Sequence, residues 1–568
     1  MSGWSLALSP ATLIAGVAGC AWLVPGRPRL ARSVALVAVA LALALLLVDA
    51  HAAFSGGVVE RSFFELVPGV SLVLRADSSG LTLVCLAGGM ALAALSSWQR
   101  GGREAGALLL GLLGTMVAAL AGNAVLLFAG IEIAGVASLV LIREGSSRLG
   151  RGVAFSFCLQ HLTSLGLLAA ALQLQSANGT SDLRALTPGA SPPSITLPWA
   201  LAGALRLFQP GAIPLVAWRR SSSAWTSAAG PCGAIVLLRL GQIEGDPPSV
   251  SLTVGLAVAG GLAALLGSIE ALRQSADARR AGRALCLAAA GPVVALAGIG
   301  GTQARGALAA GIVSLLLVLA SGAAWASREI SSRRSRALAV LALIGAGGLP
   351  TAFATTALML ELATLAALGT PALPVLCALT VSAALSALAA MRASLTIIAS
   401  PARGGVEGTS ERHRWNGGLR LDAALPIAVS AVAALAPGFA VTTVVTGLAG
   451  VGGVVVLDAA AVRAPGGGWA GGYLLVAAAI SAALFLSALA LTVERSDSGR
   501  APVARADLGS PSRPELLLPL IVAARHLAAR PVRRLTGGVR AIDAWLVGEP
   551  HLPLVLALTA LTAVALTR

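Results

Sequence analysis

Residues 105–142 form an apolar run of 38 residues in which Glu132 is the single ionisable side chain. An α-helix crosses a membrane with about 20 apolar residues, so this run is long enough for two helices. Gly122 and Asn123 are the expected hinge between them, and Glu132 then lies near the middle of the second helix. A carboxylate inside hydrocarbon is costly unless it is paired or solvated, so its position indicates a functional role.

The composition places the whole chain in the same class. Of its 568 residues 57% are hydrophobic and 11% are charged, whereas a soluble domain carries about 25% charged residues. The apolar runs have about 20 residues and do not alternate in polarity as the strands of a β-barrel do. We therefore expect an all-α polytopic membrane protein embedded in a lipid bilayer.

Neither the cysteines nor the N-terminal residues indicate a redox site, a metal site or a signal peptide. Six cysteines are scattered singly through apolar segments, so no spacing suggests a redox pair, and we expect neither a metal nor a cofactor. The first ten residues lack a basic region, which favours a retained first helix over a signal peptide.

The apolar runs predict about sixteen membrane-spanning helices. Their approximate ranges are 4–24, 33–54, 80–98, 105–122, 124–142, 152–175, 198–218, 223–241, 250–272, 283–300, 306–326, 337–366, 371–396, 423–449, 469–492 and 551–567.

The arginines support this set of spans. All 40 basic residues are arginine; 32 lie in loops after odd-numbered spans, and five lie in loops after even-numbered spans. Because arginine-rich loops stay in the cytoplasm, we expect both termini outside the cell membrane of a bacterium. The net charge of +16 is explained by these loops and does not indicate a nucleic-acid partner.

Prolines interrupt two of the predicted helices. Pro210 and Pro214 fall in the second half of the seventh span, and Pro350 follows a glycine-rich stretch in the twelfth. Broken helices at corresponding positions point to an ion path between inverted repeats. We expect two such five-helix repeats, 105–241 and 250–396; two ordinary proline kinks are the alternative.

The remaining segments complete the predicted organisation. Residues 1–104 hold helices 1–3, residues 423–492 hold helices 14 and 15, and residues 551–568 form the last helix. Residues 493–550 begin with a polar linker and continue into an amphipathic pattern, which favours a lateral helix along the cytoplasmic surface over a disordered linker.

Several segments resemble one known family. The segments are 74–83, 122–142 with Glu132, 274–285 with the charged residues Asp277, Arg279 and Arg280, the end of span 7 with Pro214 and Trp218, and 540–549 near the C-terminus. Together they resemble the antiporter-like membrane subunits of respiratory complex I, shared with Mrp-type cation/proton antiporters and membrane-bound hydrogenases. The tail is most similar to the distal, L-type subunit.

The resemblance implies a non-redox, non-catalytic membrane subunit that translocates protons while electron transfer occurs elsewhere in the complex. It implies other membrane subunits and hydrophilic redox subunits as partners. The chain departs from the family in its central helices. Gln209 replaces the lysine of helix 7. Spans 8 and 11, where the family has titratable residues, contain no lysine or histidine.

The candidate proton-path residues follow from these observations. Glu132 and Arg206 each lie eight residues into their predicted spans, at a depth of about 12 Å, so a buried pair is one hypothesis. The alternative is that Arg206 extends to the membrane surface or contacts another group. His161 is a candidate because an unperturbed histidine has a pKa of about 6.5; a side chain that only forms a hydrogen bond is the alternative. Glu270 is expected near the cytoplasmic end of its helix, where a solvated pair with Arg273 is the alternative, and Glu361 lies deeper.

Three functions remain open at this stage. The first is the proton-translocating subunit that the resemblance implies. The second is a structural subunit that keeps the fold and does not conduct, and the third is a stand-alone cation/proton antiporter.

Overall fold

The computed structural model describes a large part of the chain. The described residues are 4–23, 27–54, 58–67, 70–96, 102–144, 151–183, 193–212, 224–243, 250–275, 277–299, 304, 307–316, 340, 343, 372–399, 456–458 and 461–463.

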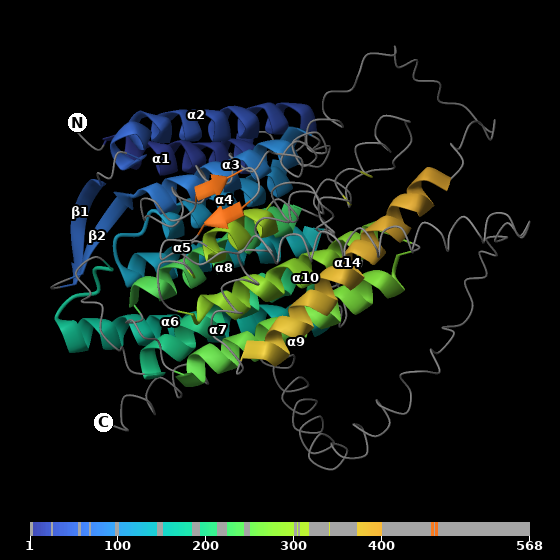
Figure 1. Cartoon of the computed structure of the whole chain (residues 1–568). Helices are drawn as coiled ribbons and strands as arrows, with labels where there is room; N and C mark the ends of the chain where they lie inside the picture. The colour runs from blue at the N-terminus through green and yellow to red at the C-terminus, as the bar shows by residue number, and fades with distance from the viewer. Residues whose placement is uncertain are drawn as a thin grey trace, which may run out of the picture. The chain divides into compact units, whose positions relative to one another are not determined.

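Helices dominate this part of the chain (Figure 1). In order, the elements are α1 (Trp4–Ala18), a short π-helix (Gly19–Leu23), α2 (Pro28–Phe54), β1 (Val59–Val67), β2 (Val70–Ala76), α3 (Ser78–Ser96), α4 (Gly102–Ala119), α5 (Ala124–Glu144), α6 (Arg151–Asn178), α7 (Pro193–Ala212), α8 (Ala224–Ile243), α9 (Val250–Arg273), α10 (Ala278–Ala297), α14 (Leu373–Ala399), β3 (Val456–Asp458) and β4 (Ala461–Arg463).

The predicted polytopic class is confirmed. Each of the first ten predicted spans, and the thirteenth, overlaps one of these helices. Six helices in the described ranges are long and apolar enough to cross a membrane, and five shorter apolar helices accompany them. Spans 14–16 and the lateral segment lie outside the described residues. Strands β3 and β4 fall in the predicted loop between spans 14 and 15. The repeat boundaries stay a prediction.

The hinge at Gly122 and Asn123 lies where the sequence places it. Helix α4 ends at Ala119 and α5 begins at Ala124. The Asn123 side-chain oxygen accepts a hydrogen bond from the backbone N–H of Leu126 at 2.8 Å. Asparagine thus caps the second helix, which explains why one long apolar run folds as two helices.

A β-hairpin between α2 and α3 was not expected from the sequence. Strands β1 and β2 pair antiparallel, with Glu60 opposite Arg75 and Val67 opposite Val70. The segment mixes charged and apolar residues, and its register shifts twice, so it lacks the regular alternation by which a strand is recognised.

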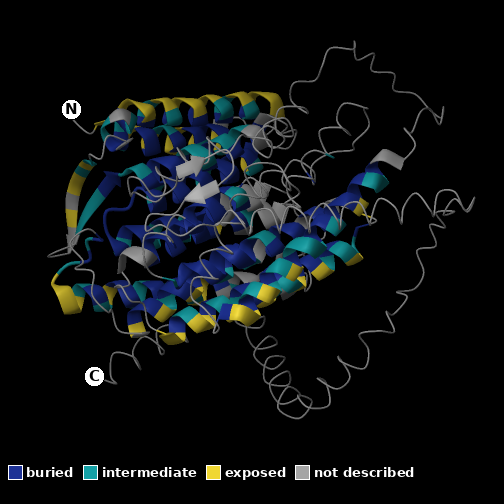
Figure 2. Ribbon diagram, in the orientation of Figure 1, coloured by how far each residue is buried: buried dark blue, intermediate teal, exposed yellow. Residues whose placement is uncertain are grey.

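Burial separates interior helices from peripheral ones. The apolar windows of α4 and α10 are 78% and 88% buried, whereas those of α1 and α2 are 33% buried. Figure 2 shows the exposed residues gathered along the outer side of α2 and along α9. The exposed side of α9 carries one aliphatic side chain in each turn: Val250, Val254, Val258, Leu262, Leu266 and Ile269. Such a surface suits contact with lipid chains.

Glycine permits two helix pairs to pack in the same close manner. A Cβ added at Gly114 of α4 would lie 2.4 Å from the Ala134 nitrogen, and one at Gly130 of α5 would lie 2.4 Å from the Ala118 nitrogen. In α9 and α10 the reciprocal contacts join Gly260 with Ala295 and Gly291 with Ala264. All four glycines are followed four residues later by alanine, so small residues bring both helix pairs together.

We expect Gly114→Ala to destabilise the bundle. The added methyl group would meet backbone atoms of α5, which cannot rotate away, so the helices must separate at a cost of about 1–3 kcal/mol. The measurement is the free energy of unfolding in detergent. Gly89→Ala in α3 is the matched control, because no described atom lies within 4 Å of its added Cβ. Equal stability of the two variants would contradict this packing.

Candidate functional site

Glu132 lies between a histidine and an arginine from two different helices. The Nδ1 atom of His161 on α6 is 2.6 Å from Oε2 of Glu132, and Nη2 of Arg206 on α7 is 3.7 Å from Oε1. The Glu132 side chain is 20% exposed, Arg206 is 1% exposed, and His161 is 45% exposed. The carboxylate therefore contacts a buried permanent cation on one side and a more accessible titratable ring on the other.

Arg206 is also held by α6. Its Nη2 donates to the hydroxyl of Ser164, and that hydroxyl donates to the carbonyl of Gln160 at 2.9 Å. The guanidinium is thus fixed by a hydrogen bond to α6 and an ion pair to α5. Arginine keeps its proton in a protein, so Arg206 supplies a constant positive charge beside Glu132.

The packing of α7 on α8 fixes the depth of Arg206. The indole N–H of Trp199 donates to the carbonyl of Val236 at 2.9 Å. A Cβ at Gly203 would lie 2.7 Å from Leu237, and one at Gly233 would lie 2.9 Å from the Leu207 nitrogen. These contacts press the two helices together on either side of Arg206 and limit its movement.

The structure brings together three of the residues singled out in the sequence. Glu132 and Arg206 lie within ion-pair distance, and His161 joins them from a third helix. Helix α7 begins at Pro193, five residues before the predicted start at 198, so Arg206 lies further along its helix than the equal-depth estimate assumed. The two side chains meet even so. Their part in a proton path stays a prediction.

The other predicted residues lie elsewhere or outside the described residues. Gln209 and Pro210 are in the last turn of α7, which continues through the proline as far as it is described. Glu270 on α9 pairs with Arg273 at 3.3 Å and contacts Gln274, as a carboxylate at a solvated helix end does. Pro214, Pro350 and Glu361 lie outside the described residues.

The charged loop motif lies at the start of α10. Asp277 pairs with Arg280 at 3.0 Å, and both side chains are about half exposed. Arg279 belongs to the same helix. This exposed pair caps the helix and does not contact the Glu132 cluster.

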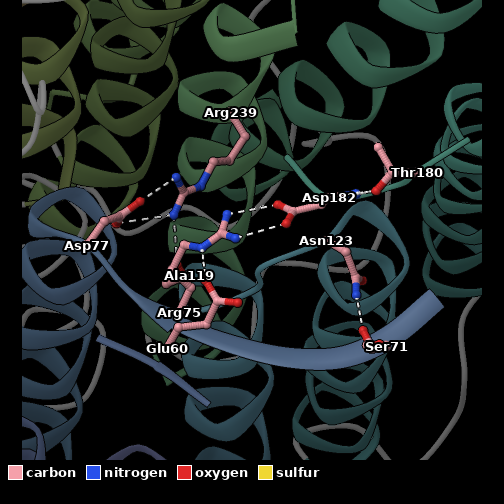
Figure 3. A network of polar contacts seen from close by, with 9 residues as sticks. All are labelled: Glu60, Ser71, Arg75, Asp77, Ala119, Asn123, Thr180, Asp182 and Arg239. Atoms are coloured by element: carbon pink, nitrogen blue, oxygen red, sulfur yellow. Dashed lines mark hydrogen bonds and ion pairs between the residues drawn. The ribbon is translucent and has the colours of Figure 1, made fainter. Parts of the chain in front are cut away.

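A second polar network ties the β-hairpin to several helix ends (Figure 3). Arg75 of β2 binds Glu60 of β1 at 3.0 Å and Asp182, after α6, at 3.0 Å. Its backbone N–H donates to the Leu120 carbonyl at 2.7 Å, and the Asn123 side chain donates to the Ser71 carbonyl. The start of α5 and the ends of α4 and α6 therefore lie on the same side of the bundle. This arrangement is expected if successive spans cross the membrane in opposite directions.

Arg239 anchors α8 to the same region. Its guanidinium binds both carboxylate oxygens of Asp77, at 2.7 and 3.2 Å, and donates to the Ala119 carbonyl at 3.1 Å. Asp77 also accepts the Gly80 N–H at 2.6 Å and so caps α3. Burial would raise the pKa of Asp77, but Arg239, Gly80 and Arg75 together hold it below its ordinary value.

This lowered pKa predicts how stability depends on pH. As the pH falls below the ordinary value of 3.8, the unfolded carboxylate takes up a proton before the folded one does. The stability that ionised Asp77 contributes is therefore complete well above pH 3.8 and is lost as the pH falls further. The difference in unfolding free energy between the native chain and Asp77→Asn should be smaller at pH 3 than at pH 6. A difference that stays constant would contradict this role.

Sequence reasoning missed Ser164 and the Asp77–Arg239 pair. An arginine at position 239, inside an otherwise apolar span, was a signal that could have revealed the pair, because intramembrane charges are rarely unpaired. Ser164 gave no signal of its own, because serine is common in membrane helices and its partner is distant in sequence.

Comparisons with known proteins identify the fold. No protein-family model matches the sequence, and no curated protein matches it. A chain of the membrane-bound sulfane sulfur reductase, an archaeal respiratory membrane complex, is 16% identical with a TM-score of 0.69, and the match covers 99% of this chain and 100% of that chain. A chain of the Mrp complex from Dietzia sp. DQ12-45-1b is 18% identical with a TM-score of 0.64, covering 99% of this chain and 63% of that one.

A third solved structure extends the likeness. A chain of respiratory complex I from Thermus thermophilus is 21% identical with a TM-score of 0.55, and the match covers 78% of this chain and 99% of that chain. The protein therefore has the fold of the polytopic membrane subunits found in these three complexes, as the resemblance predicted. At sequence identities of 16–21%, this structural likeness establishes the fold alone.

Proposed function

We propose that this chain is a non-redox membrane subunit of a multi-subunit membrane complex and that it translocates protons through a path containing Glu132. The observation that carries the proposal is the position of Glu132 between Arg206 and His161, on three adjacent helices of the bundle. The likeness to chains of an archaeal respiratory membrane complex, the Mrp complex and respiratory complex I supports the assignment to such an assembly.

His161 and Arg206 take different parts in this proposal. Arg206 is a constant charge and cannot exchange protons. The imidazole of His161 has a nitrogen that can bind and release a proton, and its Nδ1 is 2.6 Å from the Glu132 carboxylate. The proton therefore passes between Glu132 and His161, while Arg206 balances the carboxylate charge each time Glu132 is ionised.

The proposal includes the orientation and the partners of the chain. The arginine-rich loops face the cytoplasm and both termini face outside, as the positive-inside rule predicts. Other membrane subunits cover the sides of the bundle, and hydrophilic redox subunits supply the driving reaction. Recovery of the chain from native membranes together with such subunits tests this part, and recovery alone would support the stand-alone antiporter.

A structural subunit is the second candidate, and one feature favours it. Gln209 and Arg206 stand on α7, where the family's proton-releasing lysine is expected, and neither side chain releases a proton. The deciding experiment is proton flux into vesicles that contain the purified complex, driven by an imposed potassium diffusion potential. Flux that is equal in the native complex and in Glu132→Gln supports the structural role.

A further inference from the structure

Arg206 has donors that the described residues do not use. Its guanidinium is 1% exposed, yet Nε and Nη1 have no hydrogen-bond partner among the described residues. Its bond to Ser164 and its contact with Glu132 both involve Nη2. Buried donors of a charged group without an acceptor are costly, so such atoms mark a place where an acceptor binds.

Among the described atoms, few lie on the α5 side of Nη1. Gly135 lies on α5 one turn beyond Glu132 and is buried. A Cβ built on Gly135 would have one described heavy atom within 4 Å, and that atom is Arg206 Nη1 at 3.8 Å. At the tightly packed glycines between α4 and α5, Gly114 and Gly130, added Cβ atoms would lie 2.4 Å from backbone atoms. The backbone of α5 therefore stands back from the guanidinium at this point.

Charge balance decides what occupies this space. With His161 neutral, Arg206 and Glu132 already compensate each other, so a bound anion would leave a net negative charge in the membrane interior. Burying an uncompensated charge is far more costly than burying a water that accepts hydrogen bonds. Water also fits because internal waters bind where buried polar groups lack partners.

We propose that the Arg206 guanidinium holds at least one internal water in the space beside Gly135. Its part in proton movement rests on the proposed function. When Glu132 gives up its proton, this water takes that proton and passes one of its own to a further water in the same step, so the carboxylate re-forms and no hydronium persists beside the Arg206 cation. Because Arg206 itself releases no proton, the water provides the exchangeable group on the α7 side of Glu132.

High-resolution electron cryo-microscopy of the complete complex tests the site directly. We expect density for a water within hydrogen-bond distance of Arg206 Nη1 or Nε. Chloride in place of water would be revealed by stronger density after exchange into bromide, and it would overturn the proposal. Close packing of protein atoms against Nη1, with no density between, would overturn it too.

Substitution of Gly135 tests the same site in solution. Gly135→Leu fills the space with an apolar side chain that cannot accept a hydrogen bond, so we expect a lower unfolding temperature and proton flux reduced about tenfold or more. Gly89→Leu in α3 is the matched control, because its added Cβ also meets no close described atom.

The outcomes separate the two proposals. Loss of flux in Glu132→Gln with native flux and stability in Gly135→Leu would overturn the water site and leave the proposed function intact. Unchanged flux in Glu132→Gln would overturn the proposed function, whereas the density and the unfolding temperature would still decide whether the water is present.

Discussion

Replacing Glu132 by Gln should reduce potential-driven proton flux through the reconstituted complex by about a hundredfold or more. Glutamine keeps the shape of the side chain and can still hydrogen-bond His161, but it cannot bind and release a proton. The measurement is the rate of internal pH change in vesicles loaded with a pH-sensitive dye. Glu60→Gln is the matched control, because Glu60 is 41% exposed and pairs with Arg75 in the hairpin.

A double-mutant cycle tests whether Glu132 and Arg206 act together. The change in the free energy of unfolding in the double mutant should differ from the sum of the changes in Glu132→Gln and Arg206→Gln by about 0.5–3 kcal/mol. The difference is expected because each single variant removes the same ion pair. Additive effects would show that the 3.7 Å approach has no energetic consequence. Native flux in Glu132→Gln would leave the structural subunit as the better reading of the fold.

Replacing Arg239 by Leu should give the largest loss of stability in the described bundle. The substitution leaves the Asp77 carboxylate and the Ala119 carbonyl without their shared donor. Removing one partner of a buried ion pair costs about 3–5 kcal/mol. Because Asp77 is 22% exposed, water offsets part of this cost, and we expect about 2–3 kcal/mol in the free energy of unfolding.

Arg280→Leu is the matched control for Arg239→Leu. It also removes an arginine that pairs with an aspartate near the start of a helix, but both side chains of that pair are about half exposed. Exposed pairs contribute at most about 1 kcal/mol. An equally small effect at Arg239 would show that the Asp77 pair is solvated and does not hold α8 to α3.

The sequence revealed the class of fold because its signals are local. Apolar runs of helix-spanning length and arginine-rich loops each depend on neighbouring residues, and the hinge at Asn123 depends on one capping side chain three residues from its partner. The β-hairpin escaped prediction because its strands are stabilised by Arg75 and by backbone contacts to distant segments rather than by alternation of polarity.

The site could be predicted in part for the same reason. Glu132 and Arg206 stand out as charges in apolar helices, so a pairing follows from the cost of leaving either alone. The depth estimate was off because α7 begins before the predicted apolar run. Neither the role of Ser164 nor the space at Gly135 could be read from the sequence, because both depend on how α5, α6 and α7 pack.

The bond between Asp77 and Arg239 also constrains how the protein is made. The two residues are separated by 162 positions, so the carboxylate enters the membrane region long before its partner leaves the ribosome. At a synthesis rate of about 5–20 residues per second the delay is roughly 8–32 s. During that interval Asp77 lacks its Arg239 partner, and Arg75, made two residues earlier, is the arginine already at hand to offset its charge.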